Sequence, residues 1–144
     1  MNNNLKYIYA TLLVFVLTTT FSSCNKDVPT AQVELSYKML SDKTWFLDYV
    51  QTINGSSIKT RTYLGQTTYF INFLKDNTTL DSDGLAGTYS IQVLNGKILV
   101  KVNAKTSGGN PVSYDYVVES MGSKVLVMSY ASNGVINKFY YSAK

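Results

Sequence analysis

The stretch GTYSIQVLNGKILVKV, residues 87–102, decides the fold class of this chain. Apolar and polar side chains alternate through residues 87–93 and again through residues 97–103, which is the pattern of a β-strand with one buried face. Between the two runs stands Asn95-Gly96, and Asn-Gly is the strongest short signal for a hairpin because both residues tolerate positive φ. The stretch therefore predicts two antiparallel neighbouring strands.

Further strand patterns lie on both sides of this hairpin. The predicted strands are residues 44–53, 67–74, 78–81, 87–93, 97–103, 112–119, 124–131 and 135–142. Asn54-Gly55 and Asn133-Gly134 predict two more tight turns, and only residues 31–41 have helical spacing, enough for one or two turns. No segment is long enough for a βαβ crossover helix. The sequence thus predicts an all-β, antiparallel up-and-down meander of about eight strands after a short N-terminal helical turn.

The N-terminus has the layout of a secretory signal peptide. Lys6 carries the only charge before residue 24, and residues 7–21 are apolar or hydroxylic. This apolar run is shorter than the roughly 20 residues of a membrane-spanning helix, and it leads directly into the small residues Ser22 and Ser23. We therefore expect residues 1–23 to be removed.

Phe21-Ser22-Ser23-Cys24 resembles the lipobox of bacterial lipoproteins, in which a bulky apolar residue and two small ones precede a lipidated cysteine. The resemblance implies lipidation at Cys24, a tether over residues 24–30 and one domain over residues 31–144. The alternative is an ordinary signal peptide with an incidental cysteine. Asn25-Lys26-Asp27 resembles the surface-export signal of Bacteroidota lipoproteins. The expected location is the outer membrane, with the protein held there by its lipid, and both the cell surface and the periplasmic face stay open.

The composition of the chain excludes several classes of active site. It has no histidine and one cysteine, which rules out His-based acid/base catalysis, Ser-His-Asp triads and zinc held by histidine. The turns at Asp76 and Asp81 supply oxygen ligands that calcium prefers, but turn chemistry explains them and the closing Glu of a calcium loop is absent. The 13 basic residues are spread along the chain without a patch for nucleic acid. The sequence predicts a non-enzymatic protein with no metal or cofactor.

From residue 40 to the C-terminus, the chain resembles the lipocalin-like domains that are common among Bacteroidota lipoproteins. The resemblance is carried by Lys43-Thr44-Trp45-Phe46-Leu47, Tyr69-Phe70-Ile71-Asn72-Phe73 with the turn after it, Gly87-Thr88-Tyr89-Ser90-Ile91, the Asn95-Gly96 hairpin, and Lys124-Val125-Leu126-Val127-Met128. It implies an antiparallel barrel of about eight strands whose interior is either packed or holds one small ligand.

The candidate ligand-lining residues are aromatic side chains of the predicted strands. They are Trp45, Tyr49, Tyr69, Phe73, Tyr89, Tyr114 and Tyr116. Alternation puts Trp45, Leu47 and Tyr49 on one face, and we expect Trp45 to plug one end of the barrel as core, with a ligand contact as the alternative. Tyrosines in a cavity would suit a small apolar ligand or a glycan, although tyrosine is also simply a good strand residue. Two functions stay open: a binder of a small ligand, and a structural or interaction module of the envelope with a filled interior.

Overall fold

The computed structural model describes residues 28–144. Cys24 and the predicted signal peptide lie outside the described residues. The chain divides into two units, Met1–Ala31 and Gln32–Lys144, and the architecture below is that of the second unit.

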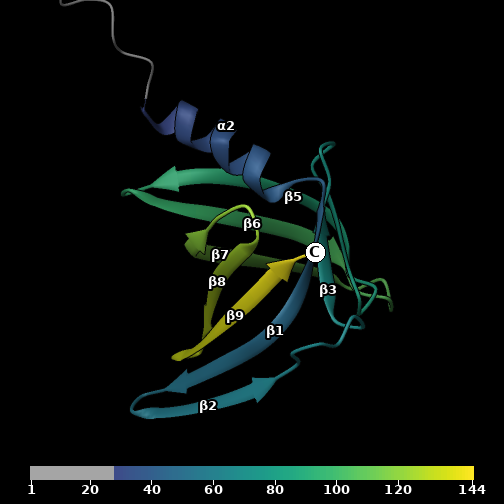
Figure 1. Ribbon diagram of the computed structural model, residues 1–144, viewed down its shortest axis with the longest axis vertical. Helices are drawn as coiled ribbons and strands as arrows, with labels where there is room; N and C mark the ends of the chain where they lie inside the picture. Colours follow the sequence, from purple (N-terminus) through teal and green to yellow (C-terminus); the bar gives the residue numbers. More distant parts are fainter. Residues whose placement is uncertain (1–27) are drawn as a thin grey trace, which may run out of the picture. The chain divides into compact units, whose positions relative to one another are not determined.

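One helix and nine strands make up the described part of the chain (Figure 1). They are α2 (Val28–Leu40), β1 (Lys43–Asn54), β2 (Ser57–Thr62), β3 (Phe70–Phe73), β4 (Thr78–Asp81), β5 (Ala86–Leu94), β6 (Lys97–Lys105), β7 (Pro111–Met121), β8 (Val125–Ser132) and β9 (Val135–Ala143). From β3 to β9 each strand pairs with the next in antiparallel fashion, and β1 joins β3 to β9. The fold is therefore a closed, eight-stranded antiparallel barrel with one extra strand, β2, which confirms the predicted fold class.

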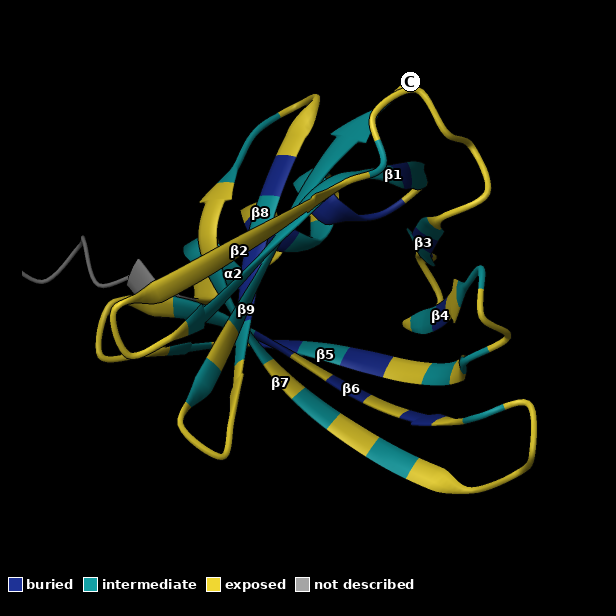
Figure 2. Cartoon of the chain, turned by 90° about the horizontal axis from the view of Figure 1, so that it is seen from below, coloured by how far each residue is buried: buried dark blue, intermediate teal, exposed yellow. Residues whose placement is uncertain are grey.

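Strand β1 serves as the common partner of three strands. One of its edges pairs with β9 from Trp45 to Asn54, whereas the other edge pairs first with β3 and then with β2. The hairpin strand β2 thus extends the sheet beyond the ring, and its six residues are all exposed, as the yellow band in Figure 2 shows. Because β2 has no apolar face, its sequence gave no strand signal, and the prediction counted eight strands without it.

A β-bulge in β1 corrects the predicted face of Tyr49. Leu47 pairs with Tyr141 and Tyr49 pairs with Tyr140, so Asp48 is an extra residue on β1. A bulge shifts every later side chain of its strand by one position relative to the partner strand. Tyr49 therefore lies on the outer face, where its ring stacks on Tyr140 at a centroid distance of 4.0 Å. The prediction that Tyr49 shares the inner face of Trp45 is wrong.

The predicted Asn95-Gly96 turn forms as a two-residue loop between Leu94 and Lys97. Its φ angles are 51° and 73°, both positive, as the type I′ hairpin requires. Asn133-Gly134 repeats this geometry between β8 and β9. These turns set the registers of two hairpins and so decide which side chains face the interior.

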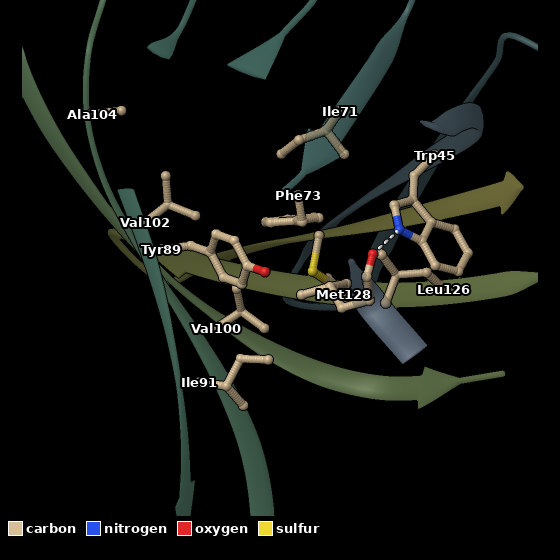
Figure 3. Close-up of a cluster of buried hydrophobic side chains, with 11 residues drawn as sticks. Trp45, Ile71, Phe73, Tyr89, Ile91, Val100, Val102, Ala104, Leu126 and Met128 are labelled. Atoms are coloured by element: carbon tan, nitrogen blue, oxygen red, sulfur yellow. Dashed lines mark hydrogen bonds between the residues drawn. The ribbon is translucent and has the colours of Figure 1, made fainter. Parts of the chain in front are cut away.

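The end of the barrel next to α2, here called the closed end, holds the hydrophobic core. Trp45, Phe73, Leu126 and Met128 are fully buried there (Figure 3), and the indole Nε1 of Trp45 donates a hydrogen bond of 2.8 Å to the carbonyl of Leu40 in α2. This position agrees with the expectation that Trp45 plugs one end of the barrel as core.

The helix is also tied to the barrel wall at the closed end. The hydroxyl of Tyr37 accepts a hydrogen bond of 3.0 Å from the backbone N–H of Ile91. The Tyr89 hydroxyl donates to the Leu74 carbonyl at 2.9 Å, and burial raises its pKa to about 12. Side chains and the helix therefore seal this end.

A ligand cavity at the open end of the barrel

The opposite end of the barrel, here called the open end, contains a cavity of about 360 Å³. Pairs of residues on β6 and β7 define the two ends: Ile98 and Val118 lie beside α2, while Ala104 and Val112 lie at the far end of the same strands. The cavity is lined by Leu47, Tyr69, Phe70, Ile71, Asp81, Ser82, Asp83, Leu85, Thr106, Tyr114, Tyr116, Tyr130, Phe139 and Tyr141. Tyr69 is 39% exposed and Asp83 is exposed, so the cavity opens to solvent.

One side of the cavity is a cluster of five rings, here called the aromatic wall. Tyr114 and Tyr116 come from β7, Tyr130 from β8, and Phe139 and Tyr141 from β9. They occupy successive inward positions, because Tyr114 and Tyr116 pair with the buried Val102 and Val100. The rings of Tyr114 and Tyr130 meet edge to face at 5.3 Å, and those of Tyr116 and Phe139 do so at 6.0 Å. Other neighbouring rings are closer to parallel, since Tyr114 and Tyr116 make an angle of 32° and Phe139 and Tyr141 stack at 20°. The wall therefore combines angular and flat parts.

The tyrosine hydroxyls of this wall make no hydrogen bond within the described part of the chain and are accessible to solvent, since Asn72 Oδ1 is the buried side-chain atom there that lacks a partner. They belong to Tyr114, Tyr116, Tyr130 and Tyr141. Two tyrosines elsewhere in the barrel differ: the hydroxyl of Tyr89 donates to a carbonyl, and that of Tyr140 donates to Gln51 Oε1 at 2.9 Å. Burial raises the pKa of Tyr116 and of Tyr141 above the ordinary value, so both hydroxyls stay protonated at neutral pH and remain donors.

The other side of the cavity is acidic. Asp81 stands at the end of β4, opposite Ile71 of β3, and its Oδ1 accepts hydrogen bonds of 2.9 Å from the N–H groups of Asp83 and Leu85. Burial raises the pKa of the Asp81 carboxyl above its ordinary value of 3.8, although the two hydrogen bonds oppose this shift. Within residues 28–144 the one ion pair joins Lys75 to Asp42, so Asp81 has no cationic partner there. The pKa values of Tyr116 and Tyr141 are raised further by this carboxylate.

The predicted site residues separate into three groups. Tyr69, Tyr114 and Tyr116 line the cavity. Trp45, Phe73 and Tyr89 lie in the core at the closed end (Figure 3), too far along the barrel to belong to the cavity lining. Tyr49 lies on the outer face for the reason given above.

Four important cavity residues were not among the sequence predictions: Asp81, Tyr130, Phe139 and Tyr141. For Tyr130, Phe139 and Tyr141, the Asn133-Gly134 turn was the sequence feature that could have predicted their inward position. A two-residue loop pairs Ser132 with Val135, and counting back from this pair sets Tyr130 opposite Asn137 on the inner face. Asp81 had the sequence signature of a turn residue only.

A second, basic groove adjoins the cavity. It has a volume of about 570 Å³ and shares Phe139 with the cavity, and Lys59 and Arg61 of β2 are among its lining residues. Arg61 Nη1 donates a long hydrogen bond of 3.5 Å to the Tyr63 hydroxyl, and the Tyr63 ring meets Tyr69 edge to face at 4.7 Å. The charged groups are thus separated: Asp81 and Asp83 line the cavity, whereas Lys59 and Arg61 line the groove, and Phe139 belongs to both linings.

Metal ligands are not gathered at the cavity. Over the described residues, no three His, Cys, Asp or Glu side chains come close enough together to hold an ion. Asp76 and Asp81 both use a carboxylate oxygen to accept turn hydrogen bonds. No helix in residues 28–144 is long and apolar enough to cross a membrane.

Comparison with known proteins assigns no family to this chain: no family model, curated protein or solved structure matches it. Inferences about its function therefore depend on the geometry of the cavity and on the chemistry of its side chains.

Proposed function

We propose that this protein is a lipid-anchored, non-catalytic protein of the bacterial envelope that binds one small ligand in the open end of its barrel. The observation that carries the binding proposal is a cavity lined by tyrosines whose hydroxyls have no partner among the described residues. Natural ligand pockets have volumes of about 300–1,000 Å³ and combine apolar walls with a few convergent polar groups. At about 360 Å³ this cavity suits a compact ligand.

The difference between the filled closed end and the hollow open end also supports the binding proposal. There the interior is filled by Trp45, Phe73 and Met128, so the barrel does not need further side chains to be stable at that end. A module with a filled interior would have similar packing at the open end too. The aromatic wall instead borders a solvent-connected space, which favours the binder over the structural or interaction module.

The proposal that the protein is non-catalytic rests on its side chains. The chain has no histidine, and Cys24 is committed to lipid under the lipobox resemblance. Oδ1 of Asp81 accepts hydrogen bonds from two backbone N–H groups. These bonds orient the carboxylate as a binding group, and they do not activate a nucleophile.

Binding is tested by thermal unfolding of the purified protein with apolar probes, fatty acids, mono- and oligosaccharides and organic cations. A ligand at 100 times its dissociation constant adds about 2.7 kcal/mol to the free energy of unfolding, which raises the Tm visibly. We expect at least one class to do so. Ser82→Trp, which puts a large ring into the cavity, should abolish the increase, whereas Ser132→Trp at an exposed position should retain it. A ligand effect that survives Ser82→Trp, or no effect from any class, contradicts the proposal.

The lipid anchor is tested separately from ligand binding. Cys24→Ala removes the sulfur that the lipobox resemblance designates for acylation. We expect this variant to lose acyl labelling and to leave the membrane fraction, because a lipid chain contributes about 0.8 kcal/mol per buried methylene. A variant that stays in the membrane, beside a parent protein that carries no lipid, would contradict the anchoring proposal.

A further inference from the structure

The cavity joins two features: a wall of electron-rich rings and a carboxylate that lacks a cationic partner in the described part of the chain. From these features we infer that the ligand is a compact organic cation, a primary or quaternary ammonium compound, held by Asp81 and by the faces of the aromatic wall. This inference rests on the proposed function of the cavity as a ligand site and specifies the class of ligand.

The rings have the arrangement that an organic cation needs. A cation is attracted to the negative face of an aromatic ring within about 6 Å of its centroid, and several rings around one point add their effects. The interplanar angle is 81° between the rings of Tyr114 and Tyr130 and 82° between those of Tyr116 and Phe139. Within these two pairs the rings form adjoining walls that can border a rounded group, and Tyr141, stacked on Phe139 at 20°, adds a flat face beside them.

The charged residues at the open end also favour a positively charged ligand. Asp81 and Asp83 are the charged residues of the cavity lining, and no Lys or Arg belongs to it. Lys59 and Arg61 line the neighbouring groove, which shares Phe139 with the cavity, and Lys105 lines a separate hollow beside Gly87 and Ala104. A bound cation would therefore meet a carboxylate without having to displace a resident lysine or arginine.

In the ligand-free protein, the Asp81 carboxylate is oriented but has no cationic partner within residues 28–144. Its Oδ1 is held by two N–H groups at 2.9 Å, which orients the carboxyl, while no hydrogen bond reaches Oδ2 from the described residues. Burial disfavours the charged form and raises the pKa of this group. A cation in the cavity would offset that cost, whereas a neutral sugar would add only hydrogen bonds.

The test compares two molecules of nearly the same shape, choline and 3,3-dimethylbutan-1-ol, in which a carbon atom replaces the charged nitrogen. Isothermal titration of the purified protein should give choline an affinity at least about tenfold higher than that of the neutral alcohol, because only the cation gains from Asp81 and the rings. Glucose serves as the third ligand, for the glycan alternative. Equal or tighter binding of the alcohol or of glucose overturns the inference.

Asp81→Asn tests the carboxylate itself. The amide oxygen can still accept from Asp83 and Leu85, so the turn is retained while the charge is lost. We expect choline affinity to fall about tenfold and the affinity for the neutral alcohol to change less than about twofold. Asp76→Asn is the matched control, since Asp76 accepts two similar hydrogen bonds from Thr78 but lies outside the cavity lining. Unchanged choline affinity in Asp81→Asn contradicts the inference.

Tyr130 provides a second, independent variant. Tyr130→Leu removes a ring from the aromatic wall and should weaken choline binding about fivefold, whereas Tyr130→Phe keeps the ring and should retain the affinity. Equal loss in both variants would mean that the hydroxyl, and not the ring, matters. If the alcohol or glucose binds and choline does not, the inference about charge fails and the proposed function stands. If no compound of any class binds a folded protein, both fail.

Discussion

At the scale of single residues, Gly87 is the glycine of the barrel at which a side chain would collide with the backbone of a neighbouring strand. Gly87 faces Ala104 across β5 and β6, and a Cβ at Gly87 would lie 2.2 Å from the carbonyl oxygen of Asn103 and 2.4 Å from Ala104 Cα. These neighbours are backbone atoms, which cannot move without shifting the strand. The two strands therefore approach closely near the open end.

Gly87→Ala should lower the free energy of unfolding by about 1–3 kcal/mol, because the added methyl group overlaps backbone atoms of β6. Denaturant unfolding monitored by circular dichroism measures this loss. Gly108→Ala is the control: its Cβ would find nothing nearer than 3.8 Å, so stability should hardly change. Equal stability of the two variants would contradict the close approach of β5 and β6.

Asp81 is the residue at which stability and binding oppose each other. Its pKa is raised in the folded protein, so the folded state holds this proton more tightly than the unfolded chain does. The free energy of unfolding therefore falls as the pH rises from below 3.8 through the raised pKa. A half-buried carboxylate without a cationic partner thus costs the ligand-free protein stability at neutral pH.

Asp81→Asn should consequently raise the Tm of the ligand-free protein at neutral pH. The difference from the parent protein should increase between about pH 3, where Asp81 is protonated, and about pH 7, where it is charged. Thermal unfolding across this range, with Asp76→Asn as the comparison, measures the effect. A difference that shrinks with rising pH would show that Asp81 stabilises the empty barrel.

At the scale of the elements, the hairpins decide which side chains reach the cavity. The Asn95-Gly96 turn fixes the register of β5 and β6, and the Asn133-Gly134 turn fixes that of β8 and β9. Slipping a hairpin by one residue would turn its entire inner face outward. Tyr130 and Phe139 lie inside the barrel because of the second turn.

Gly96→Val tests the importance of these turns. Its φ of 73° is disfavoured for a β-branched residue, although a Cβ there would meet nothing within 4 Å, so the expected cost of about 1 kcal/mol or more is backbone strain alone. Lys97→Val puts the same side chain one residue later in β6, at an exposed strand position, and should change stability by less than about 0.5 kcal/mol. Comparison of the two Tm values checks this, and an unchanged Tm in Gly96→Val would contradict the turn type.

The bulge at Asp48 shows why strand patterns were an incomplete guide to the cavity. In β5, in β6 and in β7 up to Val118 the alternation is unbroken, and the inner faces predicted from residues 87–93, 98–102 and 112–118 are confirmed by the pairings of Tyr89, Val100 and Tyr116. In β1 one extra residue reverses the alternation, and nothing in the local sequence marks the bulge. Tyr49 was therefore assigned to the wrong face.

At the scale of the whole molecule, the contacts that close the ring are the ones that a local pattern cannot show. The pairing of β1 with β9 joins residues about 90 positions apart, such as Thr52 and Asn137, whose side chains share a hydrogen bond of 2.8 Å. The predicted barrel came from the regular spacing of the strands and from the lipocalin-like resemblance. Which end would be filled and which hollow depended on where α2 docks, and the helical pattern at residues 31–41 does not contain that information.

The two ends of the barrel differ in how their interior is filled. The closed end has α2, Trp45 and a filled core, whereas the open end has the aromatic wall, Asp81 and the cavity. Trp45 is fully buried away from the cavity lining, so its emission is a poor reporter of binding. Tyrosines occur at both ends and on the outer face, and they can report on each region separately.

The most direct measurement is therefore a carbon–proton NMR titration of the purified protein labelled at its tyrosine rings, with choline, 3,3-dimethylbutan-1-ol and glucose as ligands. We expect the binding compound to shift the signals of the tyrosines in the cavity lining, namely Tyr69, Tyr114, Tyr116, Tyr130 and Tyr141. The signals of Tyr37 and Tyr89 at the closed end and of Tyr140 on the outer face should stay in place. Shifts confined to the closed end or the outer face, or no shift at the open end with any of the three compounds, would contradict this expectation.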